Sequence, residues 1–264
     1  MTEDGSGDLY AALGRFVQRS PLLVACDFDG VLAEFATDPG SARPDPRAMR
    51  ALREMARVPG TAVAIVSGRD LATLARLAEV TPEEPVTLIG SHGAESNRAA
   101  VVGGSASDAD RALLDTVAAD GADLVDQHPG ARLERKKAAV AVHTRGLPRE
   151  ASSAALSAAG ELGESHPGVK VLRGKSVVEL SVQHADKGTA LSALARLEGA
   201  AASIYFGDDV TDEDAFRALD AAGDDVTVKV GQGDTAAAYR IGAVSDVVAA
   251  LEQLLALRRD ASPR

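Results

Sequence analysis

The feature that most constrains this chain is an apolar run that stops abruptly at two carboxylates. Residues 22–26 are all apolar, and Asp27, Phe28, Asp29 and Gly30 follow them. Five consecutive apolar residues bounded in this way predict a strand buried on both faces, as in a parallel sheet. Ligands of open α/β sheets bind beyond the carboxyl ends of the strands. We therefore expect Asp27 and Asp29 at the mouth of a crevice, where such a pair can bind a metal or act as nucleophile and acid.

Strand and helix patterns alternate before and after the middle of the chain, which is typical of a parallel sheet with right-handed crossovers. The middle has a different texture, in which strand patterns mix with two helical segments. Outside the middle we expect strands at 61–66, 86–89, 203–206 and 226–230, and helices at 8–19, 47–57, 70–78, 188–197, 212–219 and 247–257, the last after a Ser245 cap. In the middle we expect helices at 110–119 and 150–162, partial alternation over 133–145, and a hairpin of 169–172 with 177–182.

The predicted fold class is α/β, with a Rossmann-like parallel-sheet core and an inserted α+β cap domain. The core is expected to comprise residues 20–98 and 183–264, after an N-terminal helical extension over 1–19, and the cap residues 99–182. The glycine-rich patch near Gly103 and the segment 182–186 are the two expected crossings between core and cap. We expect the cap to move as a unit about them.

Composition excludes several function classes. The formal net charge of -11 at pH 7 argues against a nucleic-acid partner, which would require a basic stripe. No apolar run reaches 18 residues and residues 1–20 lack a basic segment, so we expect neither a membrane span nor a signal peptide. The single cysteine, Cys26, lies in the apolar run, which excludes a disulfide framework and favours a reducing cytoplasm. The sequence does not determine the oligomeric state, and we favour a monomer.

Polar residues stand at four predicted strand ends, namely Asp27, Ser67, His92 and Asp208. Because parallel strands point the same way, these ends are expected to converge at one edge of the sheet. A DxD pair alone is usually a solvated turn, and an acidic segment such as 208–214 is usually a helix N-terminus. Their joint occurrence in this order favours a shared site instead.

The chemistry that these residue types can support is phosphoryl transfer. A phosphate dianion repels an attacking carboxylate, so a divalent cation is needed between them. Mg²⁺ prefers oxygen ligands, which the Asp27 carboxylate, the Asp29 backbone carbonyl and Asp208 can supply. Ser67 with nearby backbone N–H groups can bind phosphate, and Lys187 supplies a positive charge. Asp29 can protonate the leaving oxygen and later activate water.

Four short motifs follow one another along the chain: DFDGV at 27–31, SGR at 67–69, KG at 187–188 and GDDVTDE at 207–213. In order and spacing they resemble the haloacid dehalogenase-like superfamily. The resemblance implies a Rossmann-like core, Mg²⁺ dependence, an aspartyl-phosphate intermediate and an inserted cap that selects the substrate. It also implies that Asp27 is the nucleophile and that Asp209 and Asp212 lie in or near the surroundings of the metal.

Further motifs are SHGAE at 91–95, LERK at 133–136, VHTR at 142–145, GKSVVEL at 174–180 and GDDVTDED at 207–214. Over nearly the whole chain these are similar to the trehalose-6-phosphate phosphatases. The resemblance implies a phosphorylated disaccharide as substrate. It implies phosphate and substrate binding by Ser67, Gly68, Arg69, His92 and Gly93, and sugar contacts from Glu134, Lys136, Arg145, Lys175 and Glu179.

Two positions depart from the family pattern. Thr144 stands where the family usually has Tyr, and Ser181-Val182 replaces a basic residue followed by Pro. We expect the first to act on packing against the sugar and the second on the cap hinge. Three other functions stay open at this point: a phosphatase of another phosphorylated disaccharide or glycosyl polyol, a phosphomutase, and a non-catalytic phosphosugar-binding module.

Overall fold

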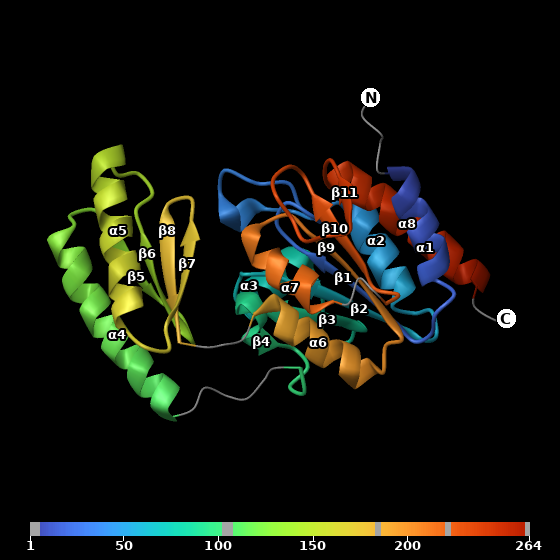
Figure 1. The fold of residues 1–264 in the computed structure, drawn as a ribbon, viewed down its shortest axis with the longest axis horizontal. Helices are drawn as coiled ribbons and strands as arrows, with labels where there is room; N and C mark the ends of the chain where they lie inside the picture. Colours follow the sequence, from blue (N-terminus) through green and yellow to red (C-terminus); the bar gives the residue numbers. More distant parts are fainter. Residues whose placement is uncertain (1–5, 102–107, 183–185, 220–222, 262–264) are drawn as a thin grey trace. The chain divides into compact units, whose positions relative to one another are not determined.

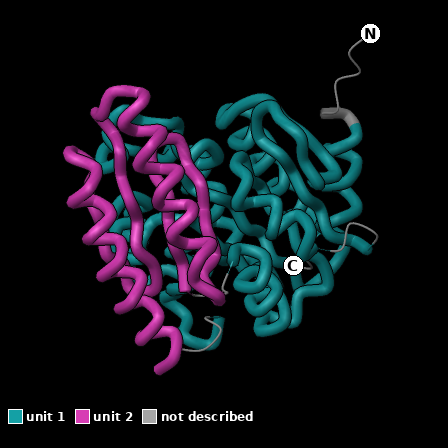
Figure 2. The backbone as a smooth tube through the Cα atoms, turned by 60° about the vertical axis from the view of Figure 1, so that its left-hand side comes forward, with its two compact units in different colours: residues 1–103, 185–264 teal, residues 104–184 magenta. Residues whose placement is uncertain are grey.

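The computed structural model describes residues 6–101, 108–182, 186–219 and 223–261. The chain divides into two compact units, one formed by Met1–Gly103 with Ala185–Arg264 and the other by Gly104–His184 (Figures 1 and 2). The first unit is discontinuous in sequence, and the second is inserted into it. The expected crossing near Gly103 and residues 183–185 of the other crossing fall outside the described residues.

The first unit contains a seven-stranded sheet in the order β11-β10-β9-β1-β2-β3-β4. All neighbouring strands are parallel except β3 and β4, which run antiparallel. The α/β fold class expected from the sequence is thereby confirmed. The strands are β1 (Leu22–Asp27), β2 (Thr61–Val66), β3 (Val86–Gly90), β4 (Glu95–Ser96), β9 (Ala202–Gly207), β10 (Val226–Val230) and β11 (Tyr239–Ile241).

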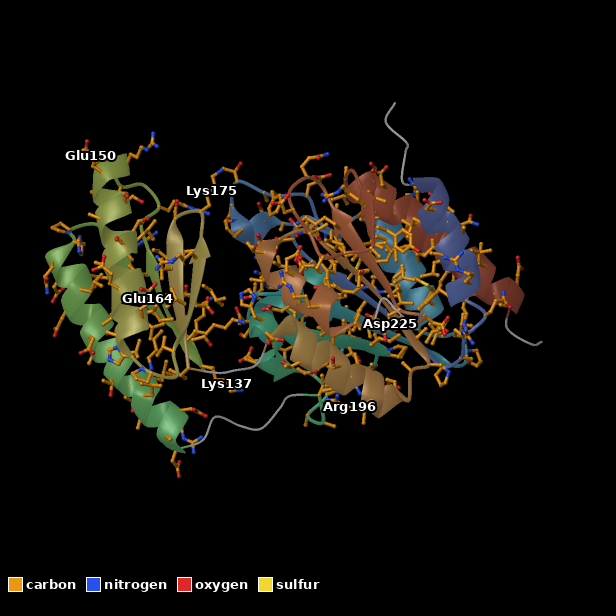
Figure 3. All side chains as sticks on the ribbon, viewed as in Figure 1. Lys137, Glu150, Glu164, Lys175, Arg196 and Asp225 are labelled. Carbon is orange, nitrogen blue, oxygen red and sulfur yellow. The ribbon has the colours of Figure 1, made fainter. Side chains whose placement is uncertain are left out.

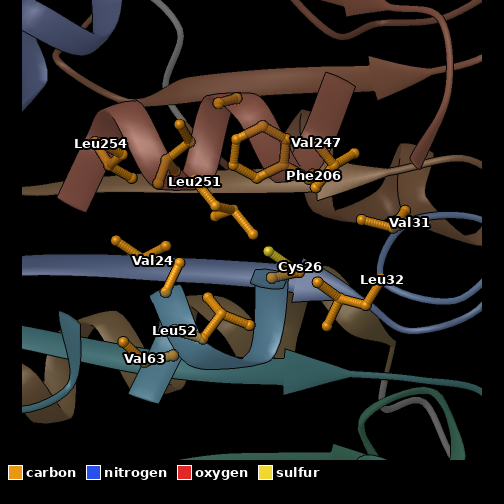
Figure 4. Close-up of a cluster of buried hydrophobic side chains, with 14 of the residues drawn as sticks. Val24, Cys26, Val31, Leu32, Leu52, Val63, Phe206, Val247, Leu251 and Leu254 are labelled. Carbon is orange, nitrogen blue, oxygen red and sulfur yellow. The ribbon is translucent and has the colours of Figure 1, made fainter. Parts of the chain in front are cut away.

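Helices cover both faces of this sheet, which explains why β1 is apolar throughout. Leu22, Val24 and Cys26 join one buried cluster, whereas Leu23 and Ala25 join another on the opposite face. Figure 4 shows Val24 and Cys26 of β1 in the first cluster, among side chains of α2 and α8. The first cluster contains residues of α1 (Ser6–Phe16), α2 (Pro46–Met55), α3 (Leu71–Ala78) and α8 (Val244–Ala261), and the second contains residues of α6 (Lys187–Glu198) and α7 (Glu213–Ala218).

The second unit is a four-stranded antiparallel sheet with two helices on one face. The strand order is β5-β6-β8-β7. Val140, Val142 and Leu180 pack in one cluster with Val117 of α4 and Ala159 of α5. The elements are α4 (Asp108–Gln127), β5 (Arg132–Arg135), β6 (Ala139–His143), α5 (Arg149–Ser165), β7 (Lys170–Gly174) and β8 (Val177–Ser181).

Close packing in this unit depends on a helical glycine. A Cβ atom on Gly163 of α5 would lie 2.5 Å from Val171 Cγ2 and 2.6 Å from Leu180 Cδ2. Glycine at this position therefore lets the helix approach β7 and β8 more closely than any other residue would allow.

Several element boundaries differ from those expected. Helix α4 continues to Gln127, past Gly121, instead of ending at Ala119. Helix α8 begins at Val244, so Ser245 is not its cap. Instead the Asp246 carboxylate accepts hydrogen bonds from the N–H groups of Gly242 (2.9 Å) and Ala243 (3.0 Å). The partial alternation expected over 133–145 is divided between two strands, and residues 139–142 of β6 are buried without alternation.

Two short strands, β4 and β11, had no counterpart in the sequence expectations. Within the described part of the chain, no helix combines the length and the apolar character needed to cross a membrane.

Candidate active site

The parallel register brings three of the expected strand ends to one edge of the sheet. Asp27 is the last residue of β1 and pairs with Val66, the last residue of β2. On the other side of β1, Cys26 pairs with Phe206 of β9. Ser67 follows β2 and Asp208 follows β9, so both lie beside Asp27 at the carboxyl ends of the strands. This is the edge at which open α/β sheets bind ligands.

Asp27 and Lys187 form a buried ion pair at this edge. The Lys187 Nζ lies 3.1 Å from Asp27 Oδ2, and the two side chains are 2% and 7% exposed. Asp27 Oδ1 also accepts a hydrogen bond from the Phe28 N–H at 2.7 Å. Burial raises the pKa of Asp27 well above its usual value, while the Lys187 ammonium acts in the opposite direction. Burial alone would lower the pKa of Lys187, but the neighbouring carboxylates raise it and keep the ammonium charged.

Asp212 is a fully buried carboxylate whose two oxygens each accept two hydrogen bonds. Oδ1 accepts from Lys187 Nζ at 2.7 Å and from the Tyr205 hydroxyl at 2.6 Å. Oδ2 accepts from the backbone N–H groups of Asp208 and Asp209, both at 2.9 Å. Although burial acts in the opposite direction, Lys187 and these donors lower the pKa of Asp212. Both of its oxygens are occupied by hydrogen bonds from the protein. Asp212 therefore holds Lys187 and the Asp208–Asp209 backbone in place.

Asp208 differs, because its buried Oδ1 has no hydrogen-bond partner among the described residues. Burial, followed by repulsion from Asp212, raises the pKa of Asp208 to about 7. Carboxylate oxygens of Asp27, Asp208 and Asp212 lie within 4.8 Å of one another. A divalent cation such as Mg²⁺ binds oxygen ligands, and this group offers several carboxylate oxygens. One of them, Asp208 Oδ1, is buried and needs a partner.

Gly30 is necessary because the loop that follows β1 lies close to the Asp208 side chain, which follows β9. Its φ is +76°, and a Cβ there would lie 2.2 Å from Asp208 Oδ2. A side chain at position 30 would therefore displace the Asp208 carboxylate as well as strain the backbone.

Asp29 is held by Arg69 in a two-pronged ion pair. The Arg69 Nε and Nη2 atoms donate to Asp29 Oδ2 and Oδ1, each at 2.6 Å. Arg69 Nη1 also donates to the Pro39 carbonyl at 2.8 Å, and its guanidinium lies 5.7 Å from the centre of the Phe28 ring. The hydrogen bonding to Asp29 is the main reason why the pKa of Arg69 is raised. Two residues that the sequence placed in separate roles are thus bonded to each other.

The Ser67–Arg69 loop is connected by hydrogen bonds to the segment that follows β3. The Ser67 N–H donates to the Ile89 carbonyl at 2.8 Å, and the Ser67 carbonyl accepts from the His92 N–H at 3.0 Å. Ser67 is buried, and its Oγ accepts a bond from the Arg69 N–H at 3.2 Å. These hydrogen bonds to the end of β3 and the turn after it fix the backbone of the Ser67–Arg69 loop, which is predicted to bind phosphate.

His92 and Gly93 lie in a turn with unusual backbone geometry. Ser91 and His92 have φ values of +48° and +53°, and Gly93 has +108°. A Cβ on Gly68 would lie 2.5 Å from the His92 ring, so the ring packs directly on this glycine. The structure therefore brings His92 to the predicted phosphate loop, in a conformation that L-residues adopt at a cost.

In the second unit, three of the predicted sugar-binding residues lie on the sheet near one another. Glu134 of β5 and Glu179 of β8 both pair in register with Ala141 of β6, so they belong to one cross-strand row. Lys136 Nζ lies 2.5 Å from Glu179 Oε2, and the His143 Nε2 lies 2.7 Å from Glu134 Oε2. This row alternates with residues packed on the helices, so it lies on the opposite face of the sheet.

Arg145 and Lys175 are exposed at one end of the same sheet, where β6 ends and β8 begins. The backbone bond from the Thr144 N–H to the Ser176 carbonyl, at 2.9 Å, links the residues next to them. Figure 3 shows Lys175 at the tip of the β7–β8 hairpin.

The two departures from the family pattern have local explanations. The Thr144 side chain is buried, with its Oγ1 2.6 Å from Ser152 Oγ of α5, so it lies on the helix side of the sheet. The expectation that the change from Tyr to Thr alters packing against the sugar stays a prediction. Ser181 ends β8, and the Val182 N–H donates to the Ala138 carbonyl at 3.1 Å.

Three buried polar residues near the site were given no role from the sequence, although one of them, Glu213, belongs to the GDDVTDE motif. Tyr205 donates to Asp212, and Lys229 Nζ donates to the Asp208 carbonyl. Glu213 accepts from the Thr235 hydroxyl at 2.7 Å and from the Ala236 N–H at 2.8 Å. Tyr205 and Lys229 are large polar side chains inside strands that were predicted to be buried, and this was the available signal, because buried polar groups need partners.

Comparison with known proteins agrees with this arrangement. The trehalose-phosphatase family model matches residues 25–244, and the chain therefore belongs to the trehalose-phosphatase family. A trehalose-6-phosphate phosphatase of Escherichia coli (strain K12) is 31% identical over 238 residues, which cover 86% of this chain and 84% of that protein. A crystal form of Aspergillus fumigatus trehalose-6-phosphate phosphatase superposes with a TM-score of 0.68 at 26% identity, covering 94% of this chain and 97% of the other. The family resemblance expected from the sequence is confirmed.

Some relatives are much longer than this chain. An uncharacterized glycosyl hydrolase of Mycobacterium tuberculosis (strain ATCC 25618 / H37Rv) is 34% identical over 263 residues. The match covers 93% of this chain but 19% of that protein, about a fifth of its length.

Proposed function

We propose that this protein is a Mg²⁺-dependent phosphatase that hydrolyses trehalose 6-phosphate to trehalose and phosphate through an aspartyl-phosphate on Asp27. The observation that carries the proposal is the group formed by the buried Asp27 and Lys187 and the partly buried Asp208 at the carboxyl edge of the parallel sheet. The name and coverage of the Escherichia coli relative support the choice of substrate.

In the first step, an oxygen of the Asp27 carboxylate attacks phosphorus and the bond from phosphorus to the sugar oxygen breaks. Asp29 gives a proton to the leaving sugar oxygen, which as an alkoxide is a poor leaving group. Lys187 lies beside Asp27 and offsets negative charge that gathers on the transferring group.

In the second step, water attacks phosphorus of the aspartyl-phosphate and Asp29 accepts its proton. The bond between phosphorus and the Asp27 oxygen breaks, which releases phosphate and restores the carboxylate. Asp29 thus serves first as acid and then as base. In the structure both Asp29 oxygens accept hydrogen bonds from Arg69, which is the arrangement of the unprotonated base. The first step therefore requires that Asp29 takes up a proton on one oxygen before the sugar oxygen leaves, and the second step restores that proton.

The residues present fit a divalent cation. Asp27, Asp208 and the Asp29 carbonyl would hold it, and the unpartnered Oδ1 of Asp208 is the observation that supports this assignment. When bound, Mg²⁺ supplies the positive charge that lets a carboxylate approach a phosphate dianion. Asp212 would hold the Asp208 and Asp209 backbone in place from beside the metal.

We assign recognition of the disaccharide to the second unit. Glu134, Lys136 and Glu179 share the sheet face that the helices do not cover, with Arg145 and Lys175 at one end of the sheet. Carboxylates accept hydrogen bonds from sugar hydroxyls, while Lys and Arg donate, and a site built from such groups discriminates against analogues that lack them.

We also place the enzyme in a reducing compartment such as the cytoplasm. Its single cysteine, Cys26, is buried in β1, and burial raises the pKa of the thiol, so it is unreactive.

A phosphate-release panel tests the proposal. The substrates are trehalose 6-phosphate, another phosphorylated disaccharide, a phosphorylated glycosyl polyol, glucose 6-phosphate and an aryl phosphate. We expect kcat/KM for trehalose 6-phosphate to exceed that of the other sugar phosphates at least about tenfold. A higher value for another disaccharide would reassign the substrate. Isomerised sugar phosphate without phosphate release would indicate a mutase, and binding without turnover a phosphosugar-binding module.

A further inference from the structure

One buried hydroxyl beside the site has no part in the steps above. Tyr205 belongs to β9 and is fully buried, and the centre of its ring lies 5.8 Å from the centre of the Phe216 ring. Its hydroxyl donates to Asp212 Oδ1 at 2.6 Å. A buried tyrosine hydroxyl needs a partner, and here that partner is the carboxylate that also binds Lys187.

Lys187 is shared unequally between two carboxylates. Its Nζ lies 2.7 Å from Asp212 Oδ1 and 3.1 Å from Asp27 Oδ2. Both carboxylates are buried, so each depends on protein donors to offset its charge. The Tyr205 hydroxyl supplies one of the two hydrogen bonds to the same Oδ1 atom, and this reduces the demand of Asp212 on the ammonium.

We propose that Tyr205 is a positioning residue whose hydroxyl sets how Lys187 is shared between Asp212 and Asp27. It touches neither substrate nor metal and acts through Asp212. The inference rests on the proposed function insofar as Asp27 is the residue that attacks phosphorus.

Replacing Tyr205 with Phe isolates the hydroxyl. The ring and its packing on Phe216 are kept, and only the bond to Asp212 is lost. Asp212 Oδ1 then depends on Lys187 alone, so the ammonium moves toward Asp212 and away from Asp27. Phosphoryl transfer to Asp27 should slow for every substrate, whereas sugar recognition should not change.

Steady-state kinetics of Tyr205→Phe with trehalose 6-phosphate and with an aryl phosphate test this proposal. We expect kcat to fall about tenfold for both substrates, which corresponds to about 1.4 kcal/mol, with KM changed less than about twofold. Tyr10→Phe is the matched control, because Tyr10 is an exposed tyrosine of α1, and it should leave both constants unchanged.

A double-mutant cycle separates positioning from a general loss of stability. If Tyr205 acts through Asp212, Tyr205→Phe should have no further effect on kcat in an Asp212→Asn background. An equal loss in both backgrounds, or a kcat within twofold of the native value, would overturn the proposal.

Crystal structures of the native protein and of Tyr205→Phe give a readout that does not depend on activity. The distance from Lys187 Nζ to Asp27 should lengthen in the variant, and an unchanged distance would also overturn the proposal. Failure on trehalose 6-phosphate alone would refute the proposed substrate, and the aryl phosphate would still report on Tyr205. Absence of all phosphatase activity would refute the proposed function, and the crystallographic distance would still decide the role of Tyr205.

Discussion

The two units hold their charged residues in opposite ways. In the first unit Lys187 and Asp212 are 2% and 0% exposed and bonded at 2.7 Å. In the second unit the Arg173 and Glu164 side chains, which are 53% and 64% exposed, form a pair of the same length. The same kind of contact is thus sealed from water in one region and open to it in the other.

The energetic consequences differ in the same way. Buried charges lose their hydration, so they depend on protein partners, and breaking one such contact is costly. Asp208 Oδ1 is the exception among the described residues of the site, and it is the atom that we assign to the cation. Exposed ion pairs contribute little to stability, because water replaces either partner readily. The first unit is therefore suited to charge chemistry that needs fixed groups, and the second to exchanging its own partners for those of a ligand.

The largest expected effect tests the buried region. Asp27→Asn removes the attacking oxygen's charge but keeps the size of the side chain. We expect a loss of at least about 100-fold in kcat for both trehalose 6-phosphate and an aryl phosphate, equivalent to about 2.7 kcal/mol of barrier. A folded Asp27→Asn protein, verified by its thermal unfolding, that retains more than about a percent of activity would exclude Asp27 as nucleophile.

Removing metal should have an effect of similar size. Exhaustive chelation should abolish phosphate release, and added Mg²⁺ should restore it, because the carboxylates and the phosphate repel each other without a cation. Circular dichroism should show that the chelated protein stays folded, since both units are built around large clusters of apolar side chains. Full activity with metal verified absent would contradict the assignment.

A loss that depends on the substrate is expected for Asp29→Asn. A general acid typically contributes about 10²–10⁴-fold, and it matters most when the leaving group is a sugar alkoxide. We therefore expect a large fall in kcat with trehalose 6-phosphate and a much smaller one with an activated aryl phosphate. Equal losses on the two substrates would show that Asp29 does not protonate the leaving oxygen.

Changes at the predicted sugar-binding residues of the second unit should affect only the sugar substrate. Glu179→Ala or Lys175→Ala is expected to cost about 2–4 kcal/mol in kcat/KM for trehalose 6-phosphate, because hydrogen bonds to charged groups are lost. The aryl phosphate makes no sugar contacts and should be nearly unaffected. Arg135→Ala is a matched control, since Arg135 is an exposed cation of β5 that pairs with Asp115 of α4.

Two results would change the assignment of the second unit. If both substrates lose activity together, these residues are structural or act in the chemistry. If neither does, they are solvated charges, and the disaccharide loses its main support.

The smallest effect is expected for His143→Gln. His143 holds one oxygen of Glu134 in an exposed pair, and glutamine still offers a donor. We expect kcat/KM for trehalose 6-phosphate to change by less than about threefold. A loss as large as that of Glu179→Ala would mean that the pair between His143 and Glu134 is as rigid as the buried contacts of the first unit.

Much of the fold could be predicted because its elements have strong local signals. The strands over residues 61–66 and 226–230 were expected with the limits that the structure shows, since both are rich in β-branched residues and lie between turn residues. Short or interrupted elements were missed for the same reason. Strand β4 has two residues, and α4 continues through Gly121, where Leu133 of β5 packs against the helix and makes up for a poor helix former.

The sequence by itself determined the kind of chemistry that we propose for this protein. An apolar strand that ends in Asp27 must place that carboxylate at the edge of a parallel sheet, and the later motifs supply the lysine and carboxylates that phosphoryl transfer needs. These conclusions depend on residue type and order, which are local properties of the chain.

Only the tertiary structure decided which of these groups are bonded to one another. Asp29 and Arg69 are 40 residues apart in sequence, and Lys187 and Asp212 are 25 apart, yet both pairs are in direct contact. The partner of Tyr205 likewise follows from a loop that folds back on β9. A buried polar group must find a partner, but which partner it finds depends on strand register and helix packing, and neither is encoded in the residue's own neighbourhood.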